Sequence, residues 1–294
     1  MREDRRSGMG SGIGPGTGQG IGQGMEPGNG PGMEPGIDPG IDPDIGEICR
    51  YLGYRGALPG EDILREIRLC KAQLAEAVTP RSVWEYYDIL TPPDTDKVIV
   101  PDADKVIVPG AGLEMESRAL ARNLAGCRRV CLMAATLGPG PDRLIARESV
   151  RQMSRAVILQ AAAAAMIEAY CDLINGMIRE EACAEGFLCR PRFSPGYGDL
   201  PLTAQIRIGE ALQMNRRIGI TLTGSLLMSP SKSVTALIGL APRSGEEAAE
   251  VGCDAMESGC DVPESGCGAT GAGFGATESG CEACSKRENC LYHR

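Results

Sequence analysis

A turn-rich segment between two helical patterns holds the side chains best suited to bind a charged ligand. It reads RPRFSPGYGDLP and spans residues 190–201. The guanidinium of Arg192 offers five donors in a planar fork that matches a carboxylate. Pro195 stiffens the turn, Gly196 lets a ligand approach the backbone, and Tyr197 adds an aromatic face and a hydroxyl. The segment suits a zwitterionic amino-acid ligand with a flat ring. The alternative is an ordinary interhelical loop whose arginine pairs with a nearby acid.

The C-terminal tail holds a second candidate site, this one for a metal. Cys281, Cys284 and Cys290 have the spacing C-x2-C-x5-C. Three thiolates so spaced could hold zinc or an iron–sulfur cluster, and the alternative is a tail of reduced thiols. The fourth ligand would come from one of three upstream cysteines, Cys253, Cys260 or Cys267. Seven further cysteines lie mainly on apolar faces and are expected to be small core residues: Cys49, Cys70, Cys127, Cys131, Cys171, Cys183 and Cys189.

The histidine content excludes several kinds of chemistry. His293, next to the C-terminus, is the only histidine of the chain. A Ser-His-Asp or Cys-His catalytic pair therefore cannot form inside the core, and neither can a histidine-rich metal site. The sequence also lacks the G-x-x-x-x-G-K-[ST] phosphate loop. This inventory favours a chemistry that depends on positioning and charge complementarity rather than on a general base.

Composition narrows the class of protein further. The formal charge of −9 and the isoelectric point near 4.9 argue against nucleic-acid binding and against an anionic membrane surface. The N-terminus has no apolar stretch of the secretory type, and no uninterrupted apolar run reaches the length of a membrane span. We therefore expect a cytoplasmic protein whose 13 cysteines are mostly thiols or metal ligands.

The hydrophobic patterns predict a single mixed α+β core. Ile63, Ile67, Cys70, Leu74 and Val78 have the spacing of an amphipathic helix. Two octads, DTDKVIVP and DADKVIVP, each predict a short strand, and their Asp-x-Asp units lack the further ligands of a calcium site. The remaining predicted elements are a helix from Ser117 to about residue 124, a buried strand over 130–136, helices over 142–186 and 203–217, a helix stop at Gly219, and strands over 220–240.

Low-complexity tracts flank this core. Residues 1–46 repeat a unit built on Pro-Gly and have too little apolar surface to offset the entropy of ordering, so we expect disorder. The predicted organisation is a disordered tract over 1–46, a domain over 47–242, a Gly- and Cys-rich linker over 243–280, and the cysteine tail over 281–294.

Two motifs of the core resemble the activation domain of cobalamin-dependent methionine synthase. That family carries an R-x-x-x-G-Y motif, matched here by Arg192, Gly196 and Tyr197. The motif is followed, after a helix, by an LT-x-S-x-x-M-x-P-x-x-S-V segment, whose matching residues here are Leu222, Thr223, Ser225, Met228, Pro230, Ser233 and Val234. The resemblance extends over about residues 48–240, but only the second half carries specific motifs.

The resemblance implies a C-shaped domain with antiparallel strands that binds S-adenosylmethionine (AdoMet). It implies that Arg192 holds the AdoMet carboxylate and that Ser194, Pro195, Gly196 and Tyr197 contact the rest. The implied activity is reductive methylation of cobalamin, a vitamin B12 cofactor of methionine biosynthesis. The alternative is a non-catalytic docking partner of a corrinoid protein whose cysteine tail binds a metal or an Fe–S cluster.

Several family features are missing from the sequence. The D-x-H-x-x-G box that binds cobalamin is absent, so the corrinoid would arrive on a separate protein, with a flavodoxin-like or other electron donor. The acidic AdoMet contact of the family is not identifiable, and Asp88 is only a weak candidate. A radical AdoMet enzyme is disfavoured, because those enzymes need a C-x3-C-x2-C motif near the start of the core.

Overall fold

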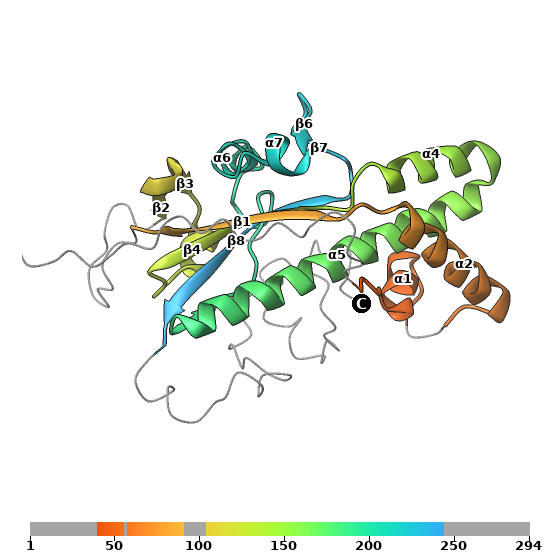
Figure 1. Ribbon diagram of the computed structural model, residues 1–294, viewed down its shortest axis with the longest axis horizontal. Coiled ribbons are helices and arrows are strands. Elements are labelled where there is room, and N and C mark those ends of the chain that lie inside the picture. The colour runs from red at the N-terminus through yellow and green to blue at the C-terminus, as the bar shows by residue number, and fades with distance from the viewer. Residues whose placement is uncertain (1–39, 56–57, 91–103, 244–294) are drawn as a thin grey trace, which may run out of the picture.

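A four-stranded antiparallel sheet forms the centre of the protein (Figure 1). The computed structural model describes residues 40–55, 58–90 and 104–243. The strands lie in the order β1 (Arg81–Asp88), β4 (Arg129–Thr136), β8 (Ser233–Pro242) and β5 (Phe187–Cys189). Neighbouring strands are distant in the sequence, so the sheet depends on long-range pairing. The predicted α+β class with antiparallel strands is confirmed.

The sequence of β4, RVCLMAAT, explains its central position in the sheet. Every residue after Arg129 is buried. The side chains alternate between two cores, with Cys131 and Met133 in one and Val130 and Leu132 in the other. A strand covered on both faces needs a continuous apolar run, which is the pattern this segment has.

Helix α5 (Met153–Ala184) covers one face of the sheet, and three further helices pack on α5: α1 (Ile45–Tyr51), α2 (Glu61–Ala77) and α4 (Gly140–Arg151). Figure 1 shows α5 running along the sheet, with α1, α2 and α4 gathered around its N-terminal half. At 1.5 Å per residue its 32 residues extend for about 48 Å. The extended backbone of Gln152 separates α4 from α5.

The opposite face carries smaller elements around the second core. They are β2 (Lys105–Val108), the 3-10 turn Pro109–Ala111, β3 (Leu113–Glu116), α3 (Arg118–Asn123), α6 (Ala204–Ala211), α7 (Met214–Ile218), β6 (Thr221–Leu222) and β7 (Met228–Ser229). Strands β2 and β3 pair as one hairpin and β6 and β7 as another. The segment that contains Arg192 passes between these two layers, at the β5 edge of the sheet.

Most of the predicted elements are present, with local corrections. The helix predicted from the apolar spacing over 63–78 is α2. It buries Leu64 and leaves Ile63 exposed, so its buried face is rotated slightly from the predicted one. Ser117 caps α3 by accepting the Leu120 N–H at 3.0 Å. The second octad forms β2, and the first lies outside the described residues. Gly219 ends α7 with a φ of +76°.

Helix α5 is long and apolar enough to cross a membrane by length and composition, although no uninterrupted apolar run within it reaches that length. It is the one helix of the described residues that has this length and composition, with a mean hydropathy of 1.6 over its most apolar window. Of that window, 61% is buried against the sheet and the neighbouring helices. Burial inside the protein accounts for its apolar composition, as expected of a core helix.

Candidate functional site

Arg192 is positioned by the edge of the sheet. After β5 the chain continues along β8, where the Arg190 N–H donates to the Gly239 carbonyl at 2.7 Å and the Phe193 N–H to the Leu237 carbonyl at 2.8 Å. Successive side chains of an extended chain point to opposite faces. Phe193 therefore packs in the second core, and Arg192 reaches the α5 side.

On that side Arg192 meets two acids of α5. Its Nη2 lies 2.9 Å from Asp172 Oδ1 and 3.4 Å from Glu168 Oε2. The two acids are four residues apart, so they lie on one face of the helix. The arginine side chain is 19% exposed, whereas those of Glu168 and Asp172 are 37% and 62% exposed. We call these three residues the arginine cluster.

The arginine cluster is incompletely satisfied. Arg192 Nη1 is buried and has no hydrogen-bond partner among the residues that the structure describes. One turn beyond Asp172, the buried Oδ1 of Asn175 also has none. An orphaned buried polar atom costs free energy, and its presence in a folded protein calls for an explanation such as a ligand. Arg192 thus has a free guanidinium nitrogen that a carboxylate could accept from.

Burial raises the pKa of Glu168, and the charge of Arg192 opposes this effect. Asp172 adds a second negative charge nearby and raises the Glu168 pKa further. The same helix carries Cys171, whose pKa is raised by burial to about 12. The arginine cluster therefore offers one cation and two carboxylates, the complement of a zwitterion that carries an additional positive charge.

A tight turn follows Arg192. The Gly196 N–H donates to the Leu200 carbonyl at 2.9 Å, and the Tyr197 N–H to Ser194 at 3.2 Å. Gly196 has a φ of +90°, a conformation that disfavours any side chain. The turn is tied to α3, because Asp199 accepts the Ser117 hydroxyl and the Arg118 N–H. These bonds fix the turn against the second layer.

The structure separates the predicted binding residues into two groups. Arg192 lies in the arginine cluster, whereas Pro195 is buried, and Gly196 and Tyr197 are exposed on the turn. Ser194 is half-buried between them.

The acids of the arginine cluster were missed by the sequence reasoning. Asp88, the weak candidate, lies on β1 at the opposite edge of the sheet, where it pairs with Arg129 at 3.4 Å. The sequence did contain a signal for them: Glu168 and Asp172, four residues apart, are the only charged residues between positions 156 and 178.

The residues of the second motif shape the β6–β7 hairpin and the start of β8. The Thr223 hydroxyl accepts the Leu227 N–H at 3.0 Å and lies 3.0 Å from the Ser225 hydroxyl. The Ser233 hydroxyl donates to the Pro230 carbonyl at 2.7 Å. These contacts shape the hairpin and the turn before β8, and a separate bond from the Gln205 side-chain amide of α6 to the Leu226 carbonyl joins the hairpin to α6.

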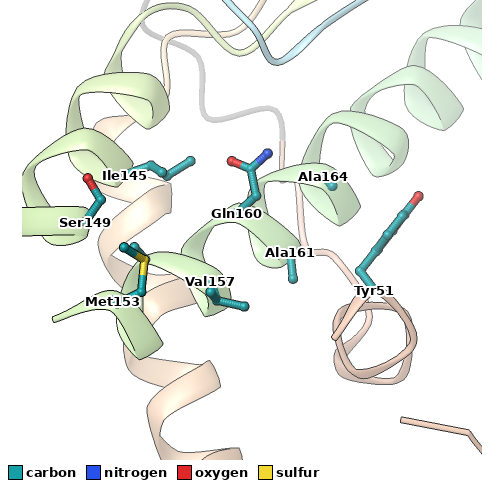
Figure 2. Close-up of a pocket in the computed structure, with 9 residues that line it drawn as sticks. Tyr51, Ile145, Ser149, Met153, Val157, Gln160, Ala161 and Ala164 are labelled. Atoms are coloured by element: carbon teal, nitrogen blue, oxygen red, sulfur yellow. The ribbon is translucent and has the colours of Figure 1, made fainter. Parts of the chain in front are cut away.

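A pocket of about 470 Å³ lies on the same stripe of α5, N-terminal to the arginine cluster. Figure 2 shows its walls, formed by α4, α5 and Tyr51 of α1. Its lining is largely apolar: Tyr51, Ile145, Ser149, Met153, Ala156, Val157, Gln160, Ala161 and Ala164. Ala164 lies one turn before Glu168, and the charge of Glu168 contributes to the raised pKa of Tyr51, which is mainly due to burial. The pocket and the arginine cluster are therefore neighbours.

The predicted metal ligands Cys281, Cys284 and Cys290 lie outside the described residues. Within residues 40–55, 58–90 and 104–243, no group of three or more His, Cys, Asp or Glu side chains could hold a metal ion. Of the seven upstream cysteines, five are buried in the two cores and Cys189 packs against the first core, as predicted for core residues. Cys183 is half-buried and differs from this prediction, because its Sγ accepts from Arg243 Nη2 at 3.2 Å.

Comparisons with known proteins found similarity among solved structures. No protein-family model matches the chain, and no curated protein matches it. Among solved structures, this chain is similar to a crystal structure of the MetH reactivation domain bound to AdoHcy, with a TM-score of 0.47 and 18% sequence identity. The match covers 66% of this chain and 73% of the other.

Proposed function

We propose that the chain is an AdoMet-binding activation subunit for reductive methylation of cobalamin, acting in trans on a methionine synthase or related corrinoid methyltransferase. The observation that carries the proposal is the arginine cluster. Arg192, the first residue of the R-x-x-x-G-Y motif, is held between two acids and keeps one buried nitrogen without a partner.

The arginine cluster provides a group for each charge of AdoMet. Arg192 would donate from its unpartnered Nη1 to the AdoMet carboxylate, in a charge-assisted hydrogen bond. Glu168 and Asp172 would face the ammonium and the sulfonium. Because both acids already contact Arg192, the ligand would enter an existing charge network rather than order a new one, which lowers the cost of binding.

The chain's own residues would position AdoMet, and they would transfer no proton. Bound AdoMet supplies an electrophilic methyl group to the cobalt of a corrinoid carried by the partner. Displacement at that carbon needs alignment of the reactants, which by itself can supply much of the rate. A site without histidine is consistent with this requirement.

A calorimetric titration of AdoMet into the full chain tests the proposal. We expect saturable binding, weakened by about 10- to 150-fold in Arg192→Ala, which corresponds to about 1.5–3 kcal/mol for a hydrogen bond to a charged group. Arg190→Ala is the matched control, because Arg190 lies in the same segment but its Nη2 donates to the Ala125 carbonyl at 3.2 Å. Equal affinity in the two variants would remove Arg192 from the site.

The metal site of the cysteine tail stays a separate prediction, as does the docking function that would use it. Zinc and iron analysis of the purified full chain, with a Cys281→Ser, Cys284→Ser double variant as control, would test it. A stoichiometric metal that the double variant loses supports the site, and a metal-free protein rules it out.

A further inference from the structure

The pocket between α1, α4 and α5 exposes apolar side chains. Met153 and Val157 of α5 are more than half exposed, and Tyr51 is 40% exposed. Exposed apolar groups that line a concave surface mark a place where another apolar group binds. A repeat in the N-terminal tract indicates what kind of group could bind there.

The N-terminal tract repeats a three-residue unit of an apolar residue, an acid and a proline. The unit occurs as Met-Glu-Pro at 25–27 and 33–35, and as Ile-Asp-Pro at 37–39 and 41–43. The first three copies lie outside the described residues, but the fourth lies within them. Its contacts give a template for how the unit binds to this fold.

The fourth copy is docked against the helical layer. Ile41 packs on the first core, and Pro43 is buried. Asp42 forms an ion pair with Lys71 of α2, with 2.6 Å between Oδ1 and Nζ. The unit thus places an apolar anchor and a proline on the helices and its acid on a basic side chain.

The pocket offers the same combination to an earlier copy. Its lining is largely apolar, and a basic side chain lies over one of its walls. The Arg50 guanidinium lies 4.6 Å from the centre of the Tyr51 ring and is paired with Glu47, with 2.6 Å between Nη2 and Oε2. An acid beside an apolar anchor would meet this guanidinium at the Tyr51 wall, in exchange for or beside Glu47.

We propose that the pocket binds the segment 25–39 of the same chain, with Met33 as the main anchor. Four residues separate the unit 33–35 from Gly40, so Pro35 is five residue steps away. An extended chain gains about 3.3–3.6 Å per step, so Pro35 can lie about 17 Å from Gly40. Residues 41–44 and helix α1, which is about 10 Å long for its seven residues, lie between Gly40 and Tyr51. The 15 residues of segment 25–39 can extend for about 50 Å, so the segment is long enough to bind in cis. This inference is independent of the proposed function.

Labelling of two tyrosines in the full chain tests the proposal. Tyr51 lines the pocket and Tyr197 lies on the turn after Arg192, and their exposed fractions are nearly equal at 40% and 44%. If segment 25–39 covers the pocket, hydroxyl-radical labelling followed by mass spectrometry should modify Tyr51 several-fold more slowly than Tyr197. In the variant Met25→Ser, Met33→Ser, Ile37→Ser the two rates should agree within about twofold.

A control variant separates the repeat from general apolar character. Met9, Ile13 and Ile21 lie in the same tract but are not followed by an acid and a proline. Replacing these three residues by serine should leave the labelling of Tyr51 as slow as in the wild type. Equal labelling of both tyrosines in the wild type would overturn the proposal, and so would a Tyr51 that stays slow in the repeat variant. In the latter case, dependence of the Tyr51 rate on protein concentration would identify a second copy as the occupant.

Discussion

Replacing Arg192 by methionine tests whether this arginine serves a ligand or the fold. Methionine keeps much of the apolar packing of the arginine stem and removes the charge. The two acids that pair with Arg192 are 37% and 62% exposed, and pairs with such accessible partners contribute about 0–1 kcal/mol each. The pairs alone therefore stabilise the free protein only slightly.

The unpartnered Nη1 acts in the opposite direction. A buried donor without a partner costs about 1–3 kcal/mol, and methionine removes that donor. We therefore expect the free energy of unfolding of Arg192→Met to lie within about 1 kcal/mol of the wild type, or above it. An arginine kept for the fold would behave as one partner of a buried ion pair, whose removal costs about 3–5 kcal/mol.

Urea unfolding followed by tryptophan fluorescence measures this difference. Trp84 is the only tryptophan, is fully buried, and donates to Glu181 of α5 at 3.1 Å, so it reports on the packing of the sheet against that helix. Arg217→Met is the matched control. The Arg217 side chain is 25% exposed and pairs with Glu85, which is only 16% exposed. We expect Arg217→Met to lower the free energy of unfolding by about 3 kcal/mol. An equal loss in both variants would refute the assignment of Arg192 to a ligand.

Three further predictions follow from single side chains. Ser117→Ala removes the cap of α3 and the hydroxyl that Asp199 accepts, so it should cost about 1 kcal/mol by thermal unfolding, and an unchanged melting temperature would contradict the capping role. Burial lowers the pKa of Lys232 below its ordinary value of 10.5, so the unfolded chain binds this proton more tightly and stability should rise with pH up to about 10.5. Lys232→Met should flatten that rise in urea titrations, and a wild-type minus variant difference that is constant with pH would be the contrary result. Cys171, with a pKa of about 12, should react with iodoacetamide only after unfolding, and modification in the native protein would show that α5 opens locally.

The elements that the sequence predicted well are those with a strong local signal. The apolar run of β4 and the serine cap of α3 each follow from residues within a few positions of one another. The segment around Arg192 was also found locally, because its arginine, prolines and glycines lie within twelve residues.

The features that were missed depend on contacts between distant residues. Strand β1, RSVWEYYD, mixes apolar and polar residues and forms an edge of the sheet, so its identity depends on pairing with β4. Strand β5 has only three residues and is defined by its register with β8. The acids of the arginine cluster belong to the site only because α5 passes Arg192 at residues 168 and 172, and the pattern of the helix alone does not fix that position.

Covering of the pocket and ligand binding at the arginine cluster should be coupled, because Ala164 lines the pocket and lies one helical turn before Glu168 of the cluster. If segment 25–39 hinders access to the cluster, the variant Met25→Ser, Met33→Ser, Ile37→Ser should bind AdoMet more tightly than the wild type. Coupling between two binding events is reciprocal, so saturating AdoMet should shift the covering of Tyr51 in the wild type by the same factor. Calorimetry gives the first factor and the Tyr51 labelling rate gives the second. A gain in affinity without faster Tyr51 labelling would show that the serine substitutions act on the arginine cluster by another route.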